Sequence, residues 1–515
     1  MLSVQFCGAA RTVTGSQYFL EYVGEDGSKF NFCIDSGMFQ VGGKVNLFKV
    51  NSHLVFDPKI LDAIVLTHAH LDHCGRIPYL VKMGFGGKIY STPTTKQIAE
   101  VVMTDAAKLS TDPEADPTHA GAKSFYFPVK NMDAESLKQE KFDIPELAKK
   151  VENPKYSQNL MKENVGLYEL YDVEQAVDRF VTHPYHEKFD IHPNISVEFY
   201  DAGHILGSAY VIITEKSTGR TVVFSGDLGN INKPIINDPE MPDCKANLTH
   251  VFIETTYGNR LHGKLEPKAK LREFAFEAIS KKGKLLIPAF SIERCQEVIY
   301  YLTELMREGL LPKTPIFLDS PMGSKVLQIC LEHEELYDPE LKRKIRDRQN
   351  PLIYSELKIL DTADQSKTLN NMKDPCIIIA GSGMCNGGRI LKHFLFNLDK
   401  PENTVLLVGY QAEGTLGREL LDGKKEVVIE EKTLEVSAKI GIITEFSAHA
   451  DQLGLKNWIS HLLTCDNNPS TIPQVFLMHG EKESSLKFGD EINAAFPNRV
   501  KTYWPYFAEK VVMWE

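Results

Sequence analysis

A short segment holds four side chains that can bind a metal ion. Residues 66–75 read Leu66-Thr67-His68-Ala69-His70-Leu71-Asp72-His73-Cys74-Gly75. Three imidazoles and a carboxylate packed together without a cation are unfavourable, because they present lone pairs to one another. Four ligands from one loop would also crowd a single ion that needs an open coordination position. The segment therefore predicts bound transition-metal ions, and two of them.

Further candidate ligands follow later apolar runs. They are His204 in Ala202–Ala209, Asp227 in Phe224–Gly229, and His479 after Val475–Met478. Each residue alone is weak evidence for a metal site. A histidine at the end of a strand, for example, is commonly solvated or hydrogen-bonded. Together with the first four they make seven ligands, which suits a two-metal hydrolytic site. Imidazole and carboxylate ligands without thiolate favour Zn²⁺, with Mn²⁺ or Fe²⁺ as alternatives.

The elements that must position these ligands are short β-branched and aromatic runs that end at polar residues and glycine. Asp35, for example, follows Phe30–Ile34. The other runs of this kind are Ala63–Leu66, Ile195–Tyr200, Val222–Phe224, His250–Ile253 and Val475–Met478. Their length and composition predict strands. Functional side chains at strand ends are typical of an α/β protein, in which loops converge on a crevice.

Helices and a second unit are also expected. Helical patterns span 94–109, 266–282 and 292–309, and the charged stretch from Asp112 to about Asp178 predicts a helical insertion on the surface. Residues 256–445 alternate strands and helices of their own, which indicates a separate α/β unit.

Composition limits the class of protein. The chain has 515 residues and a net charge of −11, which argues against an extended surface that coats nucleic acid and leaves room for a local basic groove. No apolar run approaches the roughly 18 residues that span a bilayer, and the first residues do not resemble a signal peptide. Nine cysteines without a Cys-x-x-Cys pair suggest a reducing compartment. We therefore expect a cytoplasmic protein with no membrane association.

The motif His68-x-His70-x-Asp72-His73, with His204 and Asp227, resembles the metallo-β-lactamase superfamily. Six further segments resemble its β-CASP branch, in consistent order: Glu254–Gly258, Pro288–Glu297, Gly381–Met384, Gly409–Gly417, Phe446–Asp451 and Met478–Glu481. That branch includes the pre-mRNA 3′-end processing endonuclease and bacterial RNA-degrading enzymes.

The resemblance implies a four-layer αββα sandwich with an inserted α/β β-CASP domain. The core would be 1–256, with a helical insertion at about 112–190, together with 446–515, and the cap would be 257–445. The gap between His449 and His479 is longer than the family pattern, so an insertion through 464–471 is expected. We expect no appended RNA-binding domain at either end.

The resemblance also implies roles for the site residues. One ion would be held by His68, His70 and His204, and the other by Asp72, His73 and His479. Asp227 would bridge the ions, and Asp35 would orient a ligand or the bridging water. His449 fits the general acid, and Glu254 fits its orienting partner, because a carboxylate raises the pKa of an imidazole. Without the family match, a helix or loop cap is the favoured interpretation of Glu254.

Candidate substrate contacts come from the same motifs. Ser447 and the turn Gly381, Ser382 and Gly383 would offer backbone N–H groups to phosphate, although such a glycine-rich run alone also fits a tight turn. Arg294 and Arg389 are candidates for phosphate contacts, with a surface ion pair as the alternative reading.

The resulting expectation is a zinc-dependent phosphodiesterase that cleaves single-stranded RNA with two Zn²⁺ per chain, by metal-hydroxide attack on phosphorus. The sequence does not decide between endonuclease and exonuclease action, and it is compatible with a homodimer. His479 favours RNA, because DNA-repair members usually carry an aliphatic residue there. The alternatives are a DNA nuclease of the same family, a small-molecule metallo-hydrolase that needs only the core motifs, and a non-catalytic scaffold.

Overall fold

The structure, a computed structural model, describes residues 1–40, 47–111, 166–242, 247–263, 266–411, 414–464 and 472–515. The chain forms two compact units. The first unit comprises Met1–Ile231, Asp238–Leu261 and His449–Glu515, and the second comprises Asn232–Asn237 and His262–Ala448. The predicted boundaries, 256/257 and 445/446, lie within five residues of the observed crossings at 261/262 and 448/449. The sequence did not indicate that residues 232–237 belong to the second unit.

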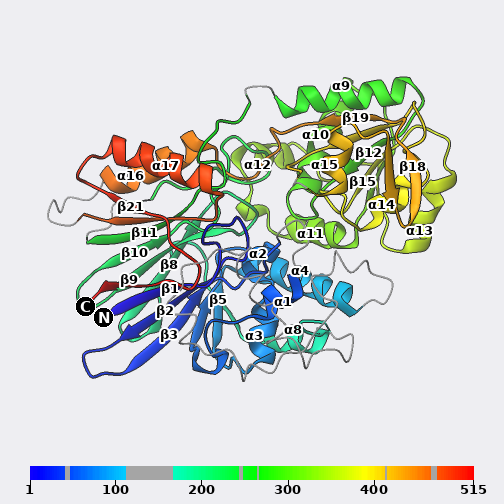
Figure 1. Cartoon of the computed structure of the whole chain (residues 1–515). Helices are drawn as coiled ribbons and strands as arrows, with labels where there is room; N and C mark the ends of the chain where they lie inside the picture. Colours follow the sequence, from blue (N-terminus) through cyan, green and yellow to red (C-terminus); the bar gives the residue numbers. More distant parts are fainter. Residues whose placement is uncertain (41–46, 112–165, 243–246, 264–265, 412–413, 465–471) are drawn as a thin grey trace. The chain divides into compact units, whose positions relative to one another are not determined.

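The first unit is built on two seven-stranded sheets (Figure 1). The first sheet has the order β22 (Lys510–Trp514), β1 (Leu2–Phe6), β2 (Tyr18–Val23), β3 (Lys29–Ile34), β4 (Ala63–Val65), β5 (Lys88–Ser91) and β6 (Phe180–Thr182). The second has the order β21 (Lys501–Tyr503), β20 (Gln474–Met478), β11 (Leu248–Glu254), β10 (Thr221–Phe224), β9 (Ala209–Glu215), β8 (Ile195–Asp201) and β7 (Phe189–His192).

Apolar side chains pack the two sheets against each other. Phe6 from the first sheet contacts Phe476 from the second, with ring centroids 5.1 Å apart. A second core joins the second sheet to α16 (Gln452–Thr464) and α17 (Lys482–Ala495) through Trp458 and Phe488. The remaining helices follow strands of the first sheet: α1 (Leu47–Ser52), α2 (Leu71–Cys74), α3 (Ile77–Lys82), α4 (Pro93–Thr111) and α8 (Leu170–Val177). The first unit is therefore an αββα sandwich, as predicted.

Parallel pairing brings the functional strand ends together. In the first sheet β3 pairs in parallel with β4, and in the second sheet β11 pairs in parallel with β10 and β20. The carboxyl ends of parallel neighbours meet at one edge of a sheet. These ends lead into Asp35, His68, Asp227, Glu254 and His479.

The predicted helical insertion at about 112–190 lies partly outside the described residues. Residues 112–165 lie outside the described part of the chain, as do most of 464–471. Of the remainder, Leu170–Val177 is helical, but Phe180–Thr182 is β6, at the edge of the first sheet, and β7 begins at Phe189. The insertion prediction extended too far, because residues 180–190 supply core strands.

The second unit contains one six-stranded parallel sheet. Its order is β14 (Leu357–Ile359), β13 (Ile316–Asp319), β15 (Ile377–Ala380), β12 (Leu285–Pro288), β16 (Thr404–Leu407) and β19 (Lys439–Ile442). The hairpin β17 (Glu426–Ile429) and β18 (Lys432–Glu435) is separate. The helices are α9 (Pro267–Ser280), α10 (Arg294–Arg307), α11 (Pro321–Glu332), α12 (Pro339–Arg346), α13 (Ala363–Thr368), α14 (Arg389–Phe394) and α15 (Leu416–Leu421).

The predicted helices at 94–109, 266–282 and 292–309 correspond to α4, α9 and α10. Among the described residues, no helix is both long enough and apolar enough to cross a membrane.

Candidate metal centre and active site

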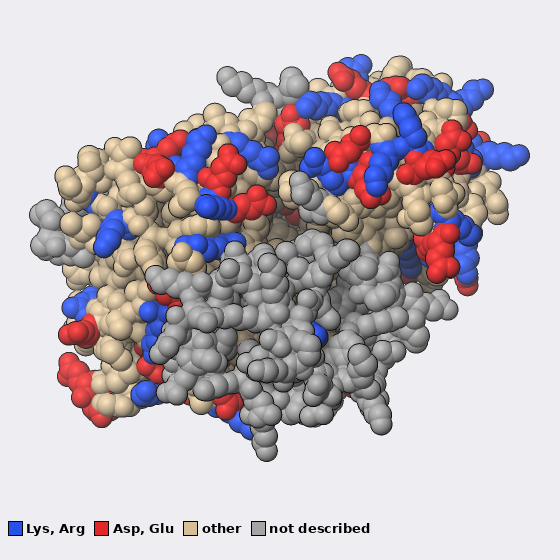
Figure 2. All heavy atoms as spheres, in the orientation of Figure 1, with Lys and Arg blue, Asp and Glu red and all other residues tan. Residues whose placement is uncertain are grey.

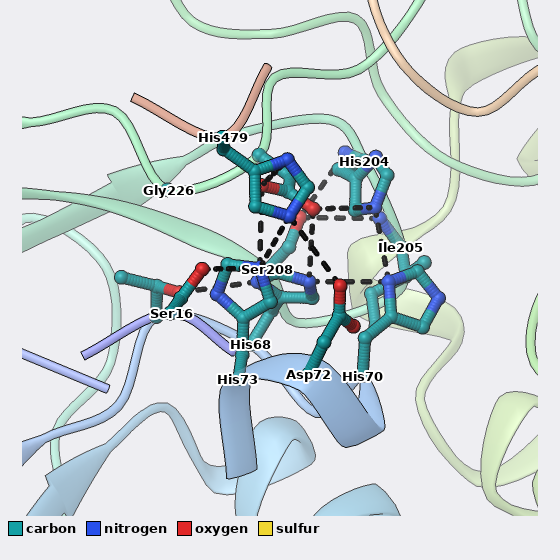
Figure 3. Close-up of polar contacts among 12 residues, drawn as sticks. Ser16, His68, His70, Asp72, His73, His204, Ile205, Ser208, Gly226 and His479 are labelled. Atoms are coloured by element: carbon teal, nitrogen blue, oxygen red, sulfur yellow. Dashed lines mark hydrogen bonds and ion pairs between the residues drawn. The ribbon is translucent and has the colours of Figure 1, made fainter. Parts of the chain in front are cut away.

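The predicted metal ligands converge in the first unit, although they come from four separate parts of the chain (Figure 3). His68 lies in the loop after β4, and Asp72 and His73 lie on the short helix α2, for which His70 is the N-cap residue. His204 follows β8, Asp227 follows β10 and His479 follows β20. The side chains gather in two groups, one of His68, His70, His204 and Asp227 and the other of Asp72, His73 and His479.

The first ligand group contains His68, His70, His204 and Asp227. Nδ1 of His70 lies 3.1 Å from Nε2 of His68 and 3.1 Å from Nε2 of His204. The Oδ2 atom of Asp227 lies 3.5 Å from His68 Nε2 and 3.7 Å from His204 Nε2. The four candidate ligand atoms all lie within 4.8 Å of one another.

The second ligand group contains Asp72, His73 and His479, with the other oxygen of Asp227 beside it. Nε2 of His479 lies 3.4 Å from both His73 Nε2 and Asp72 Oδ2. The Oδ1 atom of Asp227 lies 3.3 Å from His73 Nε2. Each oxygen of Asp227 thus faces a different ligand group, as expected of a bridging carboxylate.

These spacings fit bound cations. Ligands about 2.0–2.1 Å from a tetrahedral Zn²⁺ are about 3.3 Å from one another. The observed separations of 3.1–3.7 Å in the first group and 3.3–3.4 Å in the second are close to that value. Buried Oδ1 of Asp227 has no hydrogen-bond partner within the described residues. An ion in each group would satisfy that oxygen and the facing imidazole lone pairs.

Burial sets the protonation of the ligands. Burial and neighbouring histidines hold the pKa values of His68 and His204 well below the ordinary value, which leaves these rings neutral and able to bind metal. Burial also opposes a charge on His73, but Asp227 and Asp35 outweigh it and raise its pKa.

Residues around the ligands fix the imidazole rings. Asp35 Oδ2 lies 2.7 Å from His73 Nδ1, in the orienting position predicted for it. Thr67 donates to both oxygens of Asp35, from its backbone N–H and its hydroxyl, at 2.7 and 2.8 Å. The hydroxyl of Thr256 lies 3.1 Å from His479 Nδ1, and Ser16 Oγ lies 3.3 Å from His73 Nε2.

Sequence reasoning missed Thr67, Thr256 and Ser16. Thr67 precedes His68, and Thr256 lies within the motif segment Glu254–Gly258, so membership of the motifs was the signal for them. Nothing in the sequence pointed to Ser16, which reaches His73 only in the folded chain.

His449 and Glu254, which the family resemblance pairs, are in contact. Nδ1 of His449 lies 3.0 and 3.2 Å from the two oxygens of Glu254, and its Nε2 lies 4.0 Å from Asp227 Oδ2. Burial alone would lower the pKa of His449, but Glu254 and Asp227 outweigh it and raise that pKa to about 10. His449 also belongs to a third group of possible ligands with Asp227 and His479. Its pairing with Glu254 instead suits a ring that carries a proton.

The candidate phosphate-binding residues belong to the second unit. Arg389 donates from Nη1 to Asp319 Oδ1 at 2.6 Å and also bonds the carbonyls of Leu360 and Asp361. Arg294 is 5% exposed and pairs with Glu297. Both guanidinium groups form ion pairs with carboxylates of the second unit. These ion pairs correspond to the alternative interpretation of the two arginines. Phosphate contact by Arg294 and Arg389 stays a prediction.

The two backbone candidates are turns. The N–H of Ser447 donates to the carbonyl of Thr444 at 3.3 Å. Gly381, Ser382 and Gly383 directly follow β15, and a Cβ on Gly383 would lie 2.7 Å from the ring of Phe290. The close approach explains glycine at 383. Phosphate contact at these positions stays a prediction.

The charged surface is mixed. On the face drawn in Figure 2, Lys and Arg are interspersed with Asp and Glu over the described surface. That face has no broad patch of one sign among the described residues, consistent with the net charge of −11.

Comparisons with known proteins agree with the geometry. Residues 12–133 match the metallo-beta-lactamase superfamily, 295–420 match the Beta-Casp domain, and 433–505 match the Zn-dependent metallo-hydrolase RNA specificity domain. Ribonuclease TTHA0252 of Thermus thermophilus is 34% identical over 483 residues, which cover 94% of each chain. The chain belongs to the β-CASP branch of the metallo-β-lactamase superfamily.

Two other relatives in this family are aligned over different shares of their own length. An RNase J-like protein of Methanocaldococcus jannaschii is 30% identical over 437 residues, 84% of each chain. Transcription termination factor FttA of Methanosarcina mazei is 29% identical over 85% of this chain and 61% of its own. This β-CASP protein is a metal-dependent hydrolase of the ribonuclease family, with an RNA specificity domain.

Proposed function

We propose that this β-CASP protein is a two-metal zinc phosphodiesterase that cleaves single-stranded RNA, with His449 as the general acid. The observation that carries the proposal is the pairing of His449 with Glu254 beside, rather than within, two complete ligand groups. A metal-binding scaffold has no need of such a proton donor.

The residues would divide as follows. His68, His70 and His204 would hold one ion, and Asp72, His73 and His479 the other, with one oxygen of Asp227 directed to each. When bound, zinc ions at such a centre acidify water and withdraw charge from phosphate oxygens. Asp35 holds His73, and Thr256 holds His479, in the orientation that directs Nε2 inward.

His449 would carry the proton for the leaving group. Its Nδ1 is engaged by Glu254, so Nε2, which faces Asp227, is the atom that can donate to the leaving 3′-oxygen of RNA. Glu254 is itself held, because its Oε1 accepts the backbone N–H of Leu228 at 2.8 Å. The acid is therefore fixed at the edge of the metal centre.

Two observations support RNA as the substrate. Residues 433–505, which include His449 and His479, match an RNA specificity domain. The relative of nearly equal length, from Thermus thermophilus, is named a ribonuclease. Cleavage inside the strand and trimming from an end both fit this site.

The test is incubation of zinc-loaded wild-type protein and His449→Ala with end-labelled single-stranded RNA and DNA of one sequence. We expect wild type to cleave RNA and leave the DNA intact. His449→Ala should keep its metal content and lose activity by about 10²- to 10⁴-fold, the usual contribution of a general acid. Equal cleavage of DNA would contradict RNA specificity, and near-wild-type cleavage by His449→Ala would contradict the acid assignment.

A further inference from the structure

A short segment, Asn232–Asn237, leaves the first unit and belongs to the second. It begins five residues after Asp227. Several contacts hold it there. The backbone N–H of Asp338 donates to the carbonyl of Ile235 at 3.0 Å, and the side chain of Asn237 bonds the carbonyl of Leu336 at 3.2 Å. The segment is therefore fixed within the second unit.

Lys233 is the buried anchor of this segment. Its side chain is 6% exposed, and its Nζ lies 2.6 Å from Glu297 Oε1 and 3.9 Å from Glu293 Oε1. The same ammonium group donates to the carbonyl of Phe446 at 3.2 Å. A buried lysine is unfavourable unless it is paired and hydrogen-bonded, so these contacts define its position closely.

Phe446 is three residues before His449. The guanidinium of Arg294 lies 5.5 Å from the ring of Phe446 and pairs with the same Glu297 that holds Lys233. Lys233, Arg294 and Glu297 therefore form one buried charged cluster around Phe446. This explains the burial of Arg294, which its predicted phosphate contact did not.

The segments that carry Asp227 and His449 run alongside each other. In the first unit the N–H of Ala450 donates to the carbonyl of Leu228 at 2.8 Å, and Gly229 forms an antiparallel bridge with His449. In the second unit Lys233 joins the same two segments at Phe446. Hydrogen bonds therefore hold the loop that bears His449 both before and after this residue. Phe446 is bonded by Lys233 and Ala450 is bonded to Leu228, and both partners follow Asp227 in the chain.

We propose that Lys233 is a positioning residue that, with Glu297, holds the Phe446–His449 loop so that His449 keeps its place beside Asp227. The inference rests on the proposed role of His449. Loss of the bond to Phe446 removes one of the contacts that hold this loop, and with it the direct link to the segment that follows Asp227, so the His449 ring can shift. Misplacement of a catalytic group by about 1 Å reduces a rate by about 100-fold.

The test compares two substrates that differ in their need for an acid. RNA has a strongly basic leaving 3′-oxygen, whereas bis(p-nitrophenyl) phosphate releases p-nitrophenolate, which departs without a proton. Wild type, Lys233→Met, Lys233→Arg and His449→Ala are loaded with zinc and assayed on both, with metal content measured. Lys281→Met, which alters a partly exposed lysine of the second unit paired with Glu277, is the matched control.

For Lys233→Met we expect kcat on RNA to fall by about 10- to 100-fold with KM changed by less than about threefold. Hydrolysis of the nitrophenyl ester and metal content should stay within about twofold of wild type, and Lys233→Arg should recover part of the RNA activity. His449→Ala should show the same selective loss.

Each other outcome overturns a specific claim. Equal loss on both substrates, or no loss, by Lys233→Met contradicts the positioning role. If His449→Ala loses both activities equally, the acid assignment fails first and the inference fails with it. If Lys233→Met does not fold, as judged by circular dichroism, Lys233→Gln is used for the same comparison, because its shorter, uncharged side chain cannot keep the bonds to both Phe446 and Glu297.

Discussion

Nδ1 of His449 lies 3.0 Å from Oε1 of Glu254, although 195 positions separate the two residues in the chain. The carboxylate is held on its other side by the N–H of Leu228. The carboxylate of Glu254 therefore favours the protonated form of the His449 ring. It raises the pKa of His449, which is about 10, against the effect of burial.

Glu254→Gln should move the alkaline limb of the pH–kcat profile for RNA to lower pH. Burial disfavours the charged ring, and Glu254 outweighs burial. Without the carboxylate the pKa of His449 falls, so the ring loses its proton, and the enzyme its acid, at lower pH. Steady-state rates between about pH 6 and 10 measure this. An unchanged limb would show that another group controls it.

Asp227→Asn should reduce metal content from two ions to one or none. The two carboxylate oxygens face different ligand groups, and the amide nitrogen of asparagine cannot replace one of them. Elemental analysis after gel filtration gives the stoichiometry. Asp190→Asn, at an exposed ion pair with Lys216, is the control and should bind as wild type. Two ions retained by Asp227→Asn would disprove the bridge.

Thr256→Val should weaken only the ion held by Asp72, His73 and His479. The lost hydroxyl contacts His479 Nδ1, and removal of such an orienting contact typically costs about 10- to 100-fold in metal affinity. Competition with a chelator resolves the two affinities. Thr256→Ser keeps the hydroxyl and should bind normally. Equal weakening of both ions would show a general disturbance instead.

Asp319→Asn should destabilise the protein by about 3 kcal/mol, because it leaves buried donors without their carboxylate. Asp319 accepts hydrogen bonds from Arg389 and from His393, each at 2.6 Å. Burial raises the pKa of Asp319, but these bonds outweigh it and lower the pKa below its ordinary value. The contribution of Asp319 to the free energy of unfolding is therefore fully present at pH values above the ordinary pKa of an aspartate. It declines as the pH falls through the lower pKa that Asp319 has in the folded protein.

Urea unfolding at neutral and acidic pH measures both parts of the Asp319 prediction. Asp364→Asn removes an exposed partner of Lys367 and should cost almost nothing. A loss of stability no larger in Asp319→Asn than in that control would show that the buried cluster contributes little.

The ligands were predictable because their signals are local. His68, His70, Asp72 and His73 stand together in the sequence. Asp227 lies three residues after the apolar run that forms β10, and His479 directly follows the run that forms β20. The αββα sandwich followed from these motifs by resemblance. The contact of Ser16 was not predictable, because it depends on which segments meet in space, whereas Thr256 could be noticed only as a member of the segment Glu254–Gly258.

Arg294 shows a second limit of sequence reasoning. A conspicuous arginine in a motif fits a phosphate contact and an ion pair equally well, and only burial beside Glu297 distinguishes them. The segment 232–237 is a similar case. Its residues are unremarkable in composition, and its membership of the second unit follows from the contacts of Lys233 and Ile235.

The order of synthesis matters for a chain whose sheets are completed from both ends. His479 follows β20, an interior strand of the second sheet, and the last strand, β22, pairs with the first, β1 (Figure 1). A growing polypeptide has six of the seven ligands long before it has the seventh. Until β20 and His479 have left the ribosome, the chain lacks a ligand of the second group and an interior strand of the second sheet. The complete centre therefore assembles only after the segment that carries His479 has been synthesised, about 250 residues after Asp227.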